Sequence, residues 1–447
     1  MNNISIFGTS SDAGKSTITF VIAKLLQEEG LRVTPFKAQN VSNNAKVADD
    51  NSEIAIAQYF QAKEVLGIET SYHQNPVLLK SGYGSTSSLI IEGKAVEQKD
   101  VRAYYRDIDT LKPIVKKNFE YLAKEYDIIV AEGAGSPVEL NLMDKDLSNI
   151  FIASEFNTKI ILVADIQKGG VFASIWGVYN LLPKKLKKNV IGVIINKFQG
   201  DRTLFDEGVK IIEKDFGLRV FGVLPYHPLN LGFEDSASLL NYTQNSKDAK
   251  VKVAVINYPT MSNYNDFEPL LADSEVEVEF VRANISLKSY DMVILPGSKL
   301  TMDDYEWLQK SGLEERIKEY KGLIFGICGG YEKLCMMGLI PDKVEFFDEK
   351  IVKRDRYNIF GIELEGFEIR HGRVKKHPLY YHDKNIYATF VHEVFDSDRM
   401  REFIFKKIAP DYKGYNFKKY KREKIDEFMA IMKDSLDTKG LLECILN

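Results

Sequence analysis

The sequence of 447 residues lacks the features that mark disulfide-rich, membrane-spanning, secreted or nucleic-acid-binding proteins. Its three cysteines are too few for a disulfide framework in a chain of this length. It has no apolar run long enough to cross a bilayer, and its N-terminus does not read as a secretory signal. The formal net charge of −4 does not indicate the strongly basic surface that binds nucleic acid. We therefore expect a soluble cytoplasmic protein without membrane or nucleic-acid partners, and the sequence leaves a homo-oligomer open.

The first half of the chain alternates short apolar runs with helical patterns. Among these runs are ISIF at 4–7, DIIVAE at 127–132 and KIILVAD at 159–165. Such nearly continuous runs are typical of parallel strands covered on both faces, so we expect a doubly wound α/β domain over 1–240. A polar stretch at 241–250, NYTQNSKDAK, is interpreted as a linker, and a second α/β series predicts another domain over 251–447.

A glycine-rich loop stands between the first apolar run and the first helical pattern, and it reads FGTSSDAGKST at 7–17. A strand, a glycine loop and a helix in this order, with Lys-Ser at the junction, indicate a phosphate-binding loop. The loop is one residue longer than the common pattern, so an ordinary glycine turn is the competing interpretation. The expected ATP- and phosphate-binding residues are Gly8, Thr9, Gly14, Lys15, Ser16 and Thr17, and Ser16 would also bind Mg²⁺.

Polar side chains follow several other predicted strands. Glu132 ends one strand, Asp165 ends another, and Asn196 and Lys197 follow a third. In an open parallel sheet, ligands bind outside the carboxyl ends of the strands, where a carboxylate can help to hold Mg²⁺. Each carboxylate taken singly is equally suited to capping a helix. The shared edge makes Glu132 a candidate metal residue and the Asn-Lys pair a candidate nucleobase contact.

A second motif, GICGGYEKL at 326–334, follows an apolar run and precedes a helical pattern. The glycines around Cys328 predict a strained turn that projects the thiol at the sheet edge, and the helix N-terminus beyond it would favour the thiolate. A lone cysteine is more often a small core residue, which is how we interpret Cys335 and Cys444. For Cys328 the glycine frame favours a nucleophile.

A nucleophilic thiol also needs a base and an oxyanion site. Of the six histidines, His392 ends the apolar run IYATFVH, so we expect it at the same sheet edge as Cys328. The backbone N–H groups of Gly297 and Gly329 are the expected oxyanion donors. A thiol–histidine pair and a separate phosphate loop suggest that one domain releases ammonia from L-glutamine and the other spends ATP to use it.

Several longer segments carry a more specific resemblance. They are FKAQNVSNNA at 36–45, NPVLLK at 75–80, EGAGSPVELNLMDKDLSNI at 132–150, DIQKGGVFA at 165–173, NKFQGD at 196–201, SNYNDFEPL at 262–270, LPGSKLTMDDYEWL at 295–308 and GICGGY at 326–331. With these segments in this order, the chain resembles the adenosylcobyric acid synthase family, the glutamine-hydrolysing cobyric acid synthases of cobalamin biosynthesis. The resemblance extends over most of the chain and fades at the C-terminal end.

The resemblance implies a fold and an activity. The fold would be an N-terminal P-loop domain like that of dethiobiotin synthetase, acting as an ATP-dependent amide synthetase, and a C-terminal class I glutamine amidotransferase-like domain. The family amidates the b, d, e and g carboxylates of adenosylcobyrinic acid a,c-diamide with L-glutamine and MgATP, through acyl phosphates. Phosphorylation gives a carboxylate the leaving group that it lacks, and cationic groups such as Lys15 and Mg²⁺ neutralise the transferring phosphoryl group.

The resemblance also implies roles for individual residues. Cys328 would form a thioester, with His392 as base and then acid, in a two-residue arrangement, because Val394 stands where many such enzymes carry a carboxylate. Lys37 would stabilise the transferring phosphoryl group. The candidate metal residues are Ser16, Asp50, Glu53 and Glu132, and the candidate corrinoid contacts are Asn40, Asn43, Asn75 and Lys80.

Four positions depart from the family pattern. Asn51 and Ser52 stand where the family has two glycines, Arg370 stands where a histidine is usual, and Glu393 replaces the glycine that normally follows the histidine. These departures leave Cys328 and His392 in place. They concern the glutamine pocket and the docking of one domain on the other.

Three other functions compete with this interpretation. The related enzyme that makes the a,c-diamide shares the phosphate loop and the glutaminase, but FKAQNVSNN at 36–44 argues against it. A catalytically silent nucleotide-binding scaffold would not hydrolyse ATP in response to a corrinoid. A synthetase that uses free ammonia would be unaffected by replacing Cys328.

Overall fold

Apolar strands in two separate groups build the structure, a computed structural model that describes residues 2–81, 86–100, 108–227 and 249–447. The chain divides into unit 1, made of 1–42, 53–229 and 422–447, and unit 2, made of 43–52 and 230–421. The predicted contiguous division differs from this in two places, because the C-terminal helices belong to unit 1 and residues 43–52 belong to unit 2. Apart from its last two residues, the linker predicted at 241–250 lies outside the described residues.

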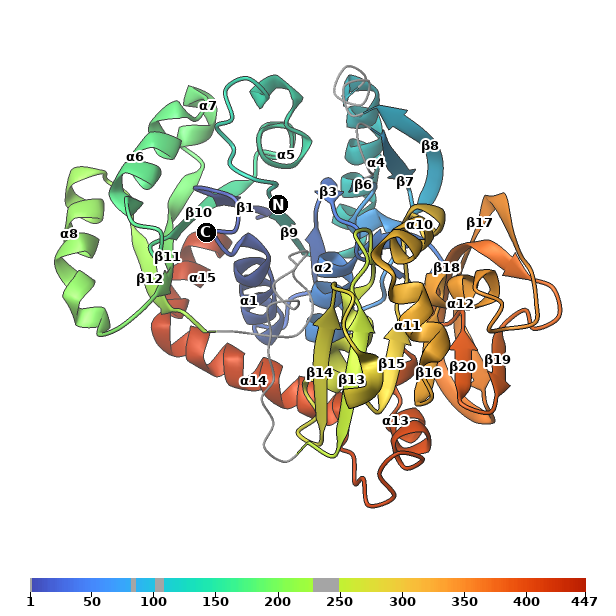
Figure 1. Cartoon of the computed structure of the whole chain (residues 1–447). Helices are drawn as coiled ribbons and strands as arrows, with labels where there is room; N and C mark the ends of the chain where they lie inside the picture. Colours follow the sequence, from blue (N-terminus) through green and yellow to red (C-terminus); the bar gives the residue numbers. More distant parts are fainter. Residues whose placement is uncertain (1, 82–85, 101–107, 228–248) are drawn as a thin grey trace. The chain divides into compact units, whose positions relative to one another are not determined.

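Unit 1 is organised around a six-stranded parallel sheet with the order β12-β11-β10-β1-β9-β2 (Figure 1). The strands are β1 (Ile4–Gly8), β2 (Val33–Phe36), β9 (Ile128–Glu132), β10 (Lys159–Asp165), β11 (Val190–Phe198) and β12 (Val220–Pro225). The apolar runs at 4–7, 127–132 and 159–165 form the three adjacent strands β1, β9 and β10. The predicted parallel sheet is therefore confirmed.

Helices cover both faces of this sheet, as a doubly wound fold requires. Ile129 and Ala131 of β9 share an apolar cluster with α4 (Lys112–Glu125), and Ile160 and Leu162 of β10 share one with α6 (Val171–Leu181). Helix α1 (Lys15–Glu28) contacts β1, β2 and β9 from the opposite side (Figure 1). It ends as the sequence indicates, with Gly30 in the left-handed region at φ 84°.

The C-terminal helices α14 (Phe417–Ser435) and α15 (Thr438–Leu446) complete unit 1 beside α1 (Figure 1). Helix α14 buries Ile425, Phe428, Met429 and Met432, which is the spacing of an apolar helical stripe. The ring of Phe428 lies 5.7 Å from that of Phe20 in α1. This stripe is why the chain from Arg422 onward groups with unit 1 by its contacts.

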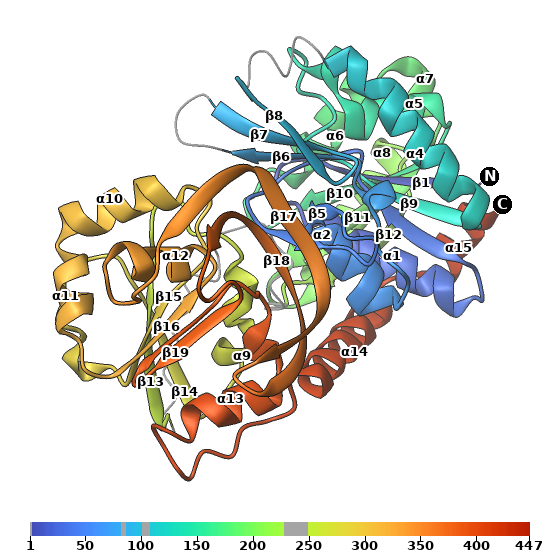
Figure 2. The same ribbon diagram turned by 90° about the vertical axis from the view of Figure 1, so that its right-hand side faces the viewer.

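Unit 1 also contains a second sheet, β3-β6-β7-β8, whose strands β6, β7 and β8 lie side by side in Figure 2. Its strands are β3 (Gln39–Val41), β6 (Val77–Ser81), β7 (Thr86–Ile91) and β8 (Lys94–Asp100). The remaining elements of unit 1 are β5 (Glu53–Ala55), α2 (Ile56–Tyr59), the π-helix η1 (Phe60–Leu66), η2 (Tyr72–Gln74), η3 (Ile108–Leu111), η4 (Met143–Lys145), η5 (Leu147–Phe151), α5 (Ile152–Glu155), α7 (Lys184–Lys187), η6 (Arg202–Phe205) and α8 (Asp206–Asp215).

Unit 2 has its own six-stranded sheet with the order β14-β13-β15-β16-β20-β19, parallel except for β19. Its strands are β13 (Val251–Ile256), β14 (Val276–Val281), β15 (Met292–Leu295), β16 (Leu323–Ile327), β19 (Tyr380–Asp383) and β20 (Ile386–Thr389). A long curved hairpin, β17 (Val344–Ile359) with β18 (Ile362–Val374), stands out in Figure 2. The other elements are β4 (Ala45–Val47), η8 (Tyr264–Phe267), α9 (Glu268–Leu271), η9 (Leu287–Ser289), α10 (Thr301–Ser311), α11 (Leu313–Glu319), α12 (Gly329–Met336), η10 (Val394–Asp396) and α13 (Asp398–Phe405).

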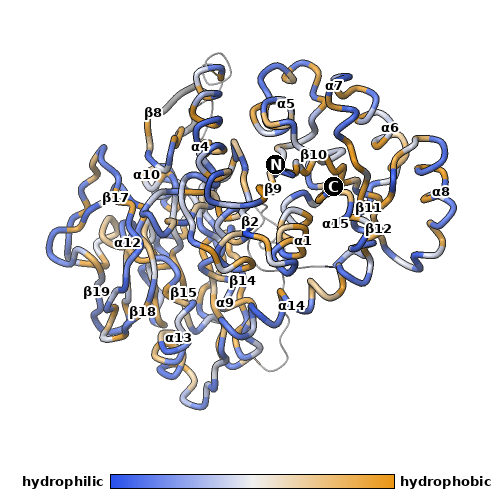
Figure 3. Tube along the Cα trace, turned by 180° about the vertical axis from the view of Figure 1, so that it is seen from behind, coloured by the Kyte–Doolittle hydropathy of each residue, from blue (hydrophilic) through white to orange (hydrophobic). Residues whose placement is uncertain are grey.

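Hydropathy follows this layering. In Figure 3 the central strands β10 and β11 are largely orange, whereas the outer helix α8 is largely blue. Within the described part of the chain, we find no helix with the length and apolar character needed to cross a membrane.

We predict that Phe428→Ala destabilises unit 1, because it removes a ring that is 1% exposed and packed on Phe20. The expected loss in the free energy of unfolding is about 3–5 kcal/mol, measured by urea denaturation. The matched control is Leu204→Ala in the same unit, whose side chain is 81% exposed and whose loss should change stability by less than about 0.5 kcal/mol. Equal effects of the two substitutions would contradict the role of α14 in unit 1.

Candidate active sites

The predicted phosphate loop has the local geometry that its glycines suggest. Helix α1 begins at Lys15, directly after Gly14, which adopts φ 92°. A Cβ atom on Gly14 would lie 2.1 Å from Nδ2 of Asn196, and one on Gly8 would lie 2.8 Å from the carbonyl oxygen of Ser10. Both positions therefore require glycine, and the strand, loop and helix follow one another as expected.

Lys15 is held at the mouth of this loop. Its Nζ donates to the carbonyl oxygen of Ser10 at 3.2 Å. Burial and the nearby Lys37 lower the pKa of Lys15 to about 8, against the opposing effect of Glu132. A buried ammonium beside a second cation gains strongly from an anionic ligand, so the loop is suited to phosphate.

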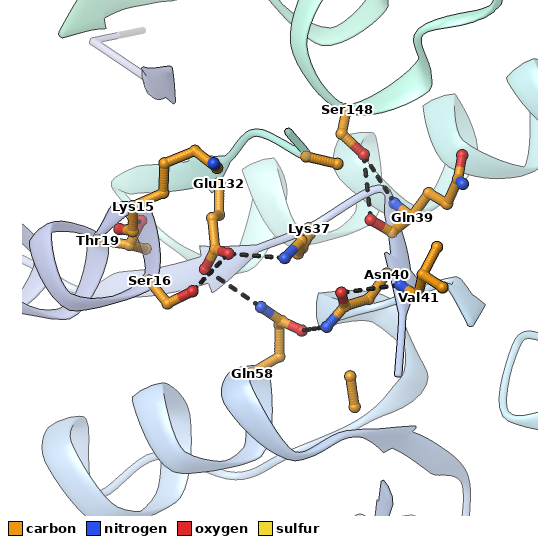
Figure 4. A network of polar contacts seen from close by, with 12 residues as sticks. Lys15, Ser16, Thr19, Lys37, Gln39, Asn40, Val41, Gln58, Glu132 and Ser148 are labelled. Carbon is orange, nitrogen blue, oxygen red and sulfur yellow. Dashed lines mark hydrogen bonds and ion pairs between the residues drawn. The ribbon is translucent and has the colours of Figure 1, made fainter. Parts of the chain in front are cut away.

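Glu132 is the centre of the polar network in unit 1 (Figure 4). Its Oε1 accepts hydrogen bonds from Ser16 Oγ at 2.8 Å and from Lys37 Nζ at 2.7 Å. Burial opposes ionisation of this 1% exposed carboxyl, but Lys37 and the hydrogen-bond donors outweigh it and hold the pKa of Glu132 below its usual value. The negative charge therefore persists in the closed network.

Two glutamines that the sequence did not single out complete the network around Glu132. Gln61 donates to Glu132 Oε2 at 2.8 Å. Gln58, which is labelled in Figure 4, donates to the same oxygen at 3.4 Å. Gln58 in turn accepts from the Asn40 amide at 3.2 Å. Neither glutamine follows a strand of the parallel sheet, so the sheet-edge argument could not find them; their spacing on one helical face was the available signal.

Of the four candidate metal residues, the structure brings Ser16 and Glu132 together. A hydroxyl and a carboxylate at the end of a phosphate loop fit Mg²⁺, which prefers few protein oxygens and the phosphates of its substrate. Glu53 forms an ion pair with Lys80 instead, and Asp50 lies in unit 2, where it accepts a hydrogen bond from Ser52 N at 3.0 Å. No group of three or more His, Cys, Asp or Glu side chains suited to a metal occurs in the described ranges.

The Asn196-Lys197 pair at the end of β11 contacts the phosphate loop itself. Asn196 Nδ2 donates to the carbonyl oxygen of Ala13 at 2.9 Å, and Lys197 Nζ donates to that of Asp12 at 2.5 Å. Lys197 also lies 3.4 Å from Asp165. Asn196 and Lys197 therefore stabilise the backbone of the phosphate loop. Their contact with a nucleobase stays a prediction, as do the direct phosphate contacts of Thr9 and Thr17.

The four candidate corrinoid contacts have different surroundings. Asn75 is 1% exposed, and its amide group donates to the carbonyl oxygens of Lys37 and Val77, so it holds the backbone that carries Lys37. Lys80 is paired with Glu53. Asn40 belongs to the network of Glu132, and Asn43 lies in unit 2 with a buried carbonyl oxygen that has no partner among the described residues. Asn75 thus supports the backbone that carries Lys37, and the corrinoid contacts of all four residues stay predictions.

The second site lies in unit 2 and centres on Cys328, between β16 and α12. Cys328 adopts φ 50° and ψ −108°, a strained conformation for a residue with a side chain. A Cβ atom on Gly330 would lie 1.8 Å from the carbonyl oxygen of Leu295, and one on Gly329 would lie 2.8 Å from Ser298 N. The strained cysteine turn is confirmed, and its flanking glycines are required by close backbone contacts.

His392 is the expected partner of this cysteine, and it contacts a third residue, Asp266. Asp266 Oδ2 lies 2.6 Å from His392 Nδ1, and both side chains are 1% exposed. Burial alone would lower the pKa of His392, but Asp266 and the nearby Cys328 raise it to about 10. The expected two-residue arrangement is therefore incomplete: the site contains Cys328, His392 and Asp266.

Asp266 was missed because it lies in the short 3₁₀ helix η8 and not at a strand end. The available signal was its place inside SNYNDFEPL, one of the segments that carry the family resemblance. It also accepts a hydrogen bond from the backbone N–H of Glu393 at 3.0 Å. The carboxylate thus fixes both the imidazole ring and the next peptide.

The expected oxyanion residues lie against the same groups. A Cβ atom on Gly297 would lie 3.0 Å from Cε1 of His392, and the loop that follows Gly297 touches Gly329 at Ser298. The two glycine backbones therefore approach the thiol–imidazole pair from β15 and from the start of α12. Cys335 lies further along α12 and is buried. Burial, together with nearby Asp342 and Glu332, raises the pKa of its thiol to about 12, which suits an unreactive core residue. Cys444 is only half-buried.

Comparisons with known proteins match both units. Residues 4–231 match the family model described as a CobQ/CobB/MinD/ParA nucleotide binding domain, and residues 252–400 match the one described as a CobB/CobQ-like glutamine amidotransferase domain. Proteins named cobyric acid synthase are similar along the whole chain. That of Acinetobacter baylyi is 58% identical over 100% of this chain and 99% of its own length. Those of Clostridium acetobutylicum (33% identical, 99% and 98% covered) and Listeria monocytogenes (35%, 99% and 96%) are more distant.

We predict that the stability of the protein falls with rising pH between about 6.5 and 10 through His392. In this range the folded state keeps a proton on His392 that the unfolded state has lost, so unfolding releases that proton and the free energy of unfolding decreases by up to ~1.4 kcal/mol per pH unit. Denaturation of Asp266→Asn over the same range should show a smaller slope, because the neutral amide no longer raises the pKa of the ring. Burial lowers the pKa of Lys15 and Lys333 to about 8, so the titration of these lysines increases the free energy of unfolding as the pH rises. This opposing contribution is the same in the wild type and in Asp266→Asn. Identical slopes would show that His392 is not held as an imidazolium.

We predict that Glu132→Gln weakens the binding of MgATP about tenfold or more, because it removes the charge that Ser16 and Lys37 contact. Titration calorimetry with ATP, with and without Mg²⁺, measures this effect. The matched control is Glu120→Gln, which changes an exposed carboxylate of α4 and should leave the affinity unchanged. Unaltered Mg²⁺ dependence in Glu132→Gln would exclude this carboxylate from the metal site.

Proposed function

This chain belongs to the cobyric acid synthase family, and from that premise we propose that unit 2 hydrolyses glutamine at Cys328 while unit 1 uses ATP to activate corrinoid carboxylates. The activity is a glutamine-dependent amidation in cobalamin biosynthesis, which makes the enzyme a carbon–nitrogen ligase. The single observation that carries the proposal is the Cys328–His392–Asp266 arrangement, which is built for attack on an amide. All three cysteines are unpaired thiols, which suits the reducing cytoplasm in which we place the reaction.

Glutamine hydrolysis in unit 2 begins with the thiol. His392 already holds the proton of Cys328 as an imidazolium, and the thiolate attacks the side-chain amide carbon of glutamine. The backbone N–H groups of Gly297 and Gly329 stabilise the oxyanion, and the imidazolium gives its proton to the leaving nitrogen, which departs as ammonia. Water then attacks the thioester with His392 as base, and glutamate is released. Asp266 keeps the ring oriented and stabilises its cationic form throughout.

The synthetase reaction in unit 1 begins with ATP on the phosphate loop. Lys15 and Lys37 neutralise charge on the γ-phosphoryl group as a corrinoid carboxylate attacks it, which gives an acyl phosphate and ADP. Ser16 and Glu132 would hold the Mg²⁺ that offsets the phosphate charge. Ammonia then attacks the acyl carbon, and phosphate leaves. The acceptor that we propose is adenosylcobyrinic acid a,c-diamide, amidated at the b, d, e and g carboxylates.

We predict that the protein with glutamine, ATP and Mg²⁺ converts adenosylcobyrinic acid a,c-diamide into a ladder of amides, followed by mass spectrometry. Cys328→Ala should abolish the ladder with glutamine and keep it with ammonium, because the thioester cannot form while unit 1 is unchanged. Cys335→Ala is the matched control, since it changes a buried thiol of the same helix and should retain glutamine use.

The possible outcomes separate the competing functions. Amidation of cobyrinic acid in place of its a,c-diamide would favour the enzyme that makes the a,c-diamide. A ladder with ammonium alone in the wild type would mean a synthetase with an inactive glutaminase. No product and no ATP hydrolysis with either nitrogen source would favour a silent scaffold.

A further inference from the structure

Residues 43–52 are part of unit 2, although the chain before and after them belongs to unit 1. The segment contains β4 and a turn that ends at Ser52. Two residues tied to the network and ion pairs of unit 1 flank it in the sequence, Asn40 on one side and Glu53 on the other. The segment is therefore a piece of the synthetase sequence that folds with the glutaminase.

Within unit 2, this segment is bound to the residue that follows the catalytic histidine. Lys46 forms an ion pair with Glu393, and Arg354 of β17 lies 3.0 Å from the other carboxylate oxygen of Glu393. Arg354 also donates to the carbonyl oxygen of Val47 at 2.6 Å. Burial opposes the charge of Glu393, but Arg354 and Lys46 outweigh it and hold its pKa far below the usual value. Lys46, Glu393 and Arg354 thus form one buried ionic clamp.

The segment is also connected to His392 through Asn44 and Asn263. The backbone N–H of Asn263 donates to the side-chain oxygen of Asn44 at 2.9 Å. The amide nitrogen of Asn263 lies 3.3 Å from both ring nitrogens of His392. Because the backbone N–H of Glu393 also donates to Asp266, the segment holds neighbours of His392 on two sides.

Two residues at the clamp have left-handed backbone conformations, which indicates that their side chains have a role. Glu393 adopts φ 66° and Asn51 adopts φ 62°, in the left-handed region that favours glycine. The side chains of Asn51 and Glu393 meet at Arg354, since Asn51 accepts a hydrogen bond from the Arg354 backbone N–H at 2.8 Å and Glu393 pairs with its guanidinium. A strained backbone conformation that carries a bonded side chain points to a role for that side chain.

We propose that residues 43–52 are a coupling element: through the Lys46–Glu393–Arg354 clamp and the Asn44–Asn263 contact they position His392 in response to ligands of the synthetase. The proposal rests on the proposed function, because it needs ATP and the corrinoid to bind beside Asn40 and Glu53. Ligands that favour one conformation of the flanking chain shift the segment, and with it Glu393 and Asn263. Lys46 and Glu393 are positioning residues, since they act through His392.

The test compares the release of glutamate in the absence and in the presence of ATP and adenosylcobyrinic acid a,c-diamide. We expect the wild type to be stimulated by these ligands, and Lys46→Met to lose about tenfold of that stimulation, within the usual range of coupling between sites. Amidation with ammonium should stay within about twofold of the wild type, because Lys46 takes no part in the synthetase chemistry. Unstimulated wild-type hydrolysis, or unchanged stimulation in Lys46→Met, would overturn the proposal.

Further variants separate positioning from general stability. Lys46→Arg keeps the charge and should restore most of the stimulation. Glu393→Gly suits a backbone at φ 66°, so it keeps the turn while removing the carboxylate, and it should uncouple hydrolysis as Lys46→Met does. Lys353→Met is the matched control, because Lys353 is the neighbour of Arg354 on β17 and its ion pair with Asp355 is exposed. If Lys46→Arg fails to restore the stimulation, or if Lys353→Met loses it as Lys46→Met does, the effect is structural. Either result would contradict positioning.

The result also distinguishes the two proposals. If wild-type protein does not amidate the a,c-diamide with ammonium, the proposed function fails whatever Lys46 does. If it does so, and glutamate release in Lys46→Met still responds fully to ATP and the corrinoid, only the coupling element fails.

Discussion

Each candidate site is organised around one carboxylate that is almost completely removed from water. A buried carboxylate stays charged only where cations and hydrogen-bond donors replace the lost solvent. Glu132 meets this requirement with Lys37, Ser16 and two glutamines, and Asp266 meets it with His392 and a backbone N–H. The catalytic groups are therefore the partners that keep these charges buried. Removing a carboxylate leaves its partners uncompensated, so the sites depend on Glu132 and Asp266 for their geometry as well as their charge.

Residues at the ends of parallel strands could be predicted from the sequence. Gly14 and Lys15 follow β1, Glu132 ends β9, and Cys328 follows β16, and in each case an apolar run and a glycine mark the position. The topology of such sheets brings strand ends to one edge, so local sequence carries long-range information. This is why the phosphate loop, the cysteine turn and both sheets were found.

Residues that act from helices and loops could not be found in the same way. Gln58, Gln61 and Asp266 reach their partners through tertiary contacts between segments far apart in the sequence, and no strand end marks them. The grouping of Asp50 with unit 2 could not be predicted for a related reason. Its neighbours 43–52 belong to unit 2 because of contacts with Glu393 and Arg354, which lie hundreds of residues away. Local pattern predicts an element, whereas its membership of a domain depends on which distant surface covers it.

The place of α14 and α15 in unit 1 has a consequence for the order in which the protein can fold during its synthesis. The sheet of unit 1 is made before unit 2, yet the helices that cover Phe20 and contact β12 are made after it. Unit 2 is complete earlier, since residues 43–52 have already been made when its own strands emerge. Unit 1 is thus finished after unit 2, and until then its apolar surface around α1 depends on other means of protection from aggregation.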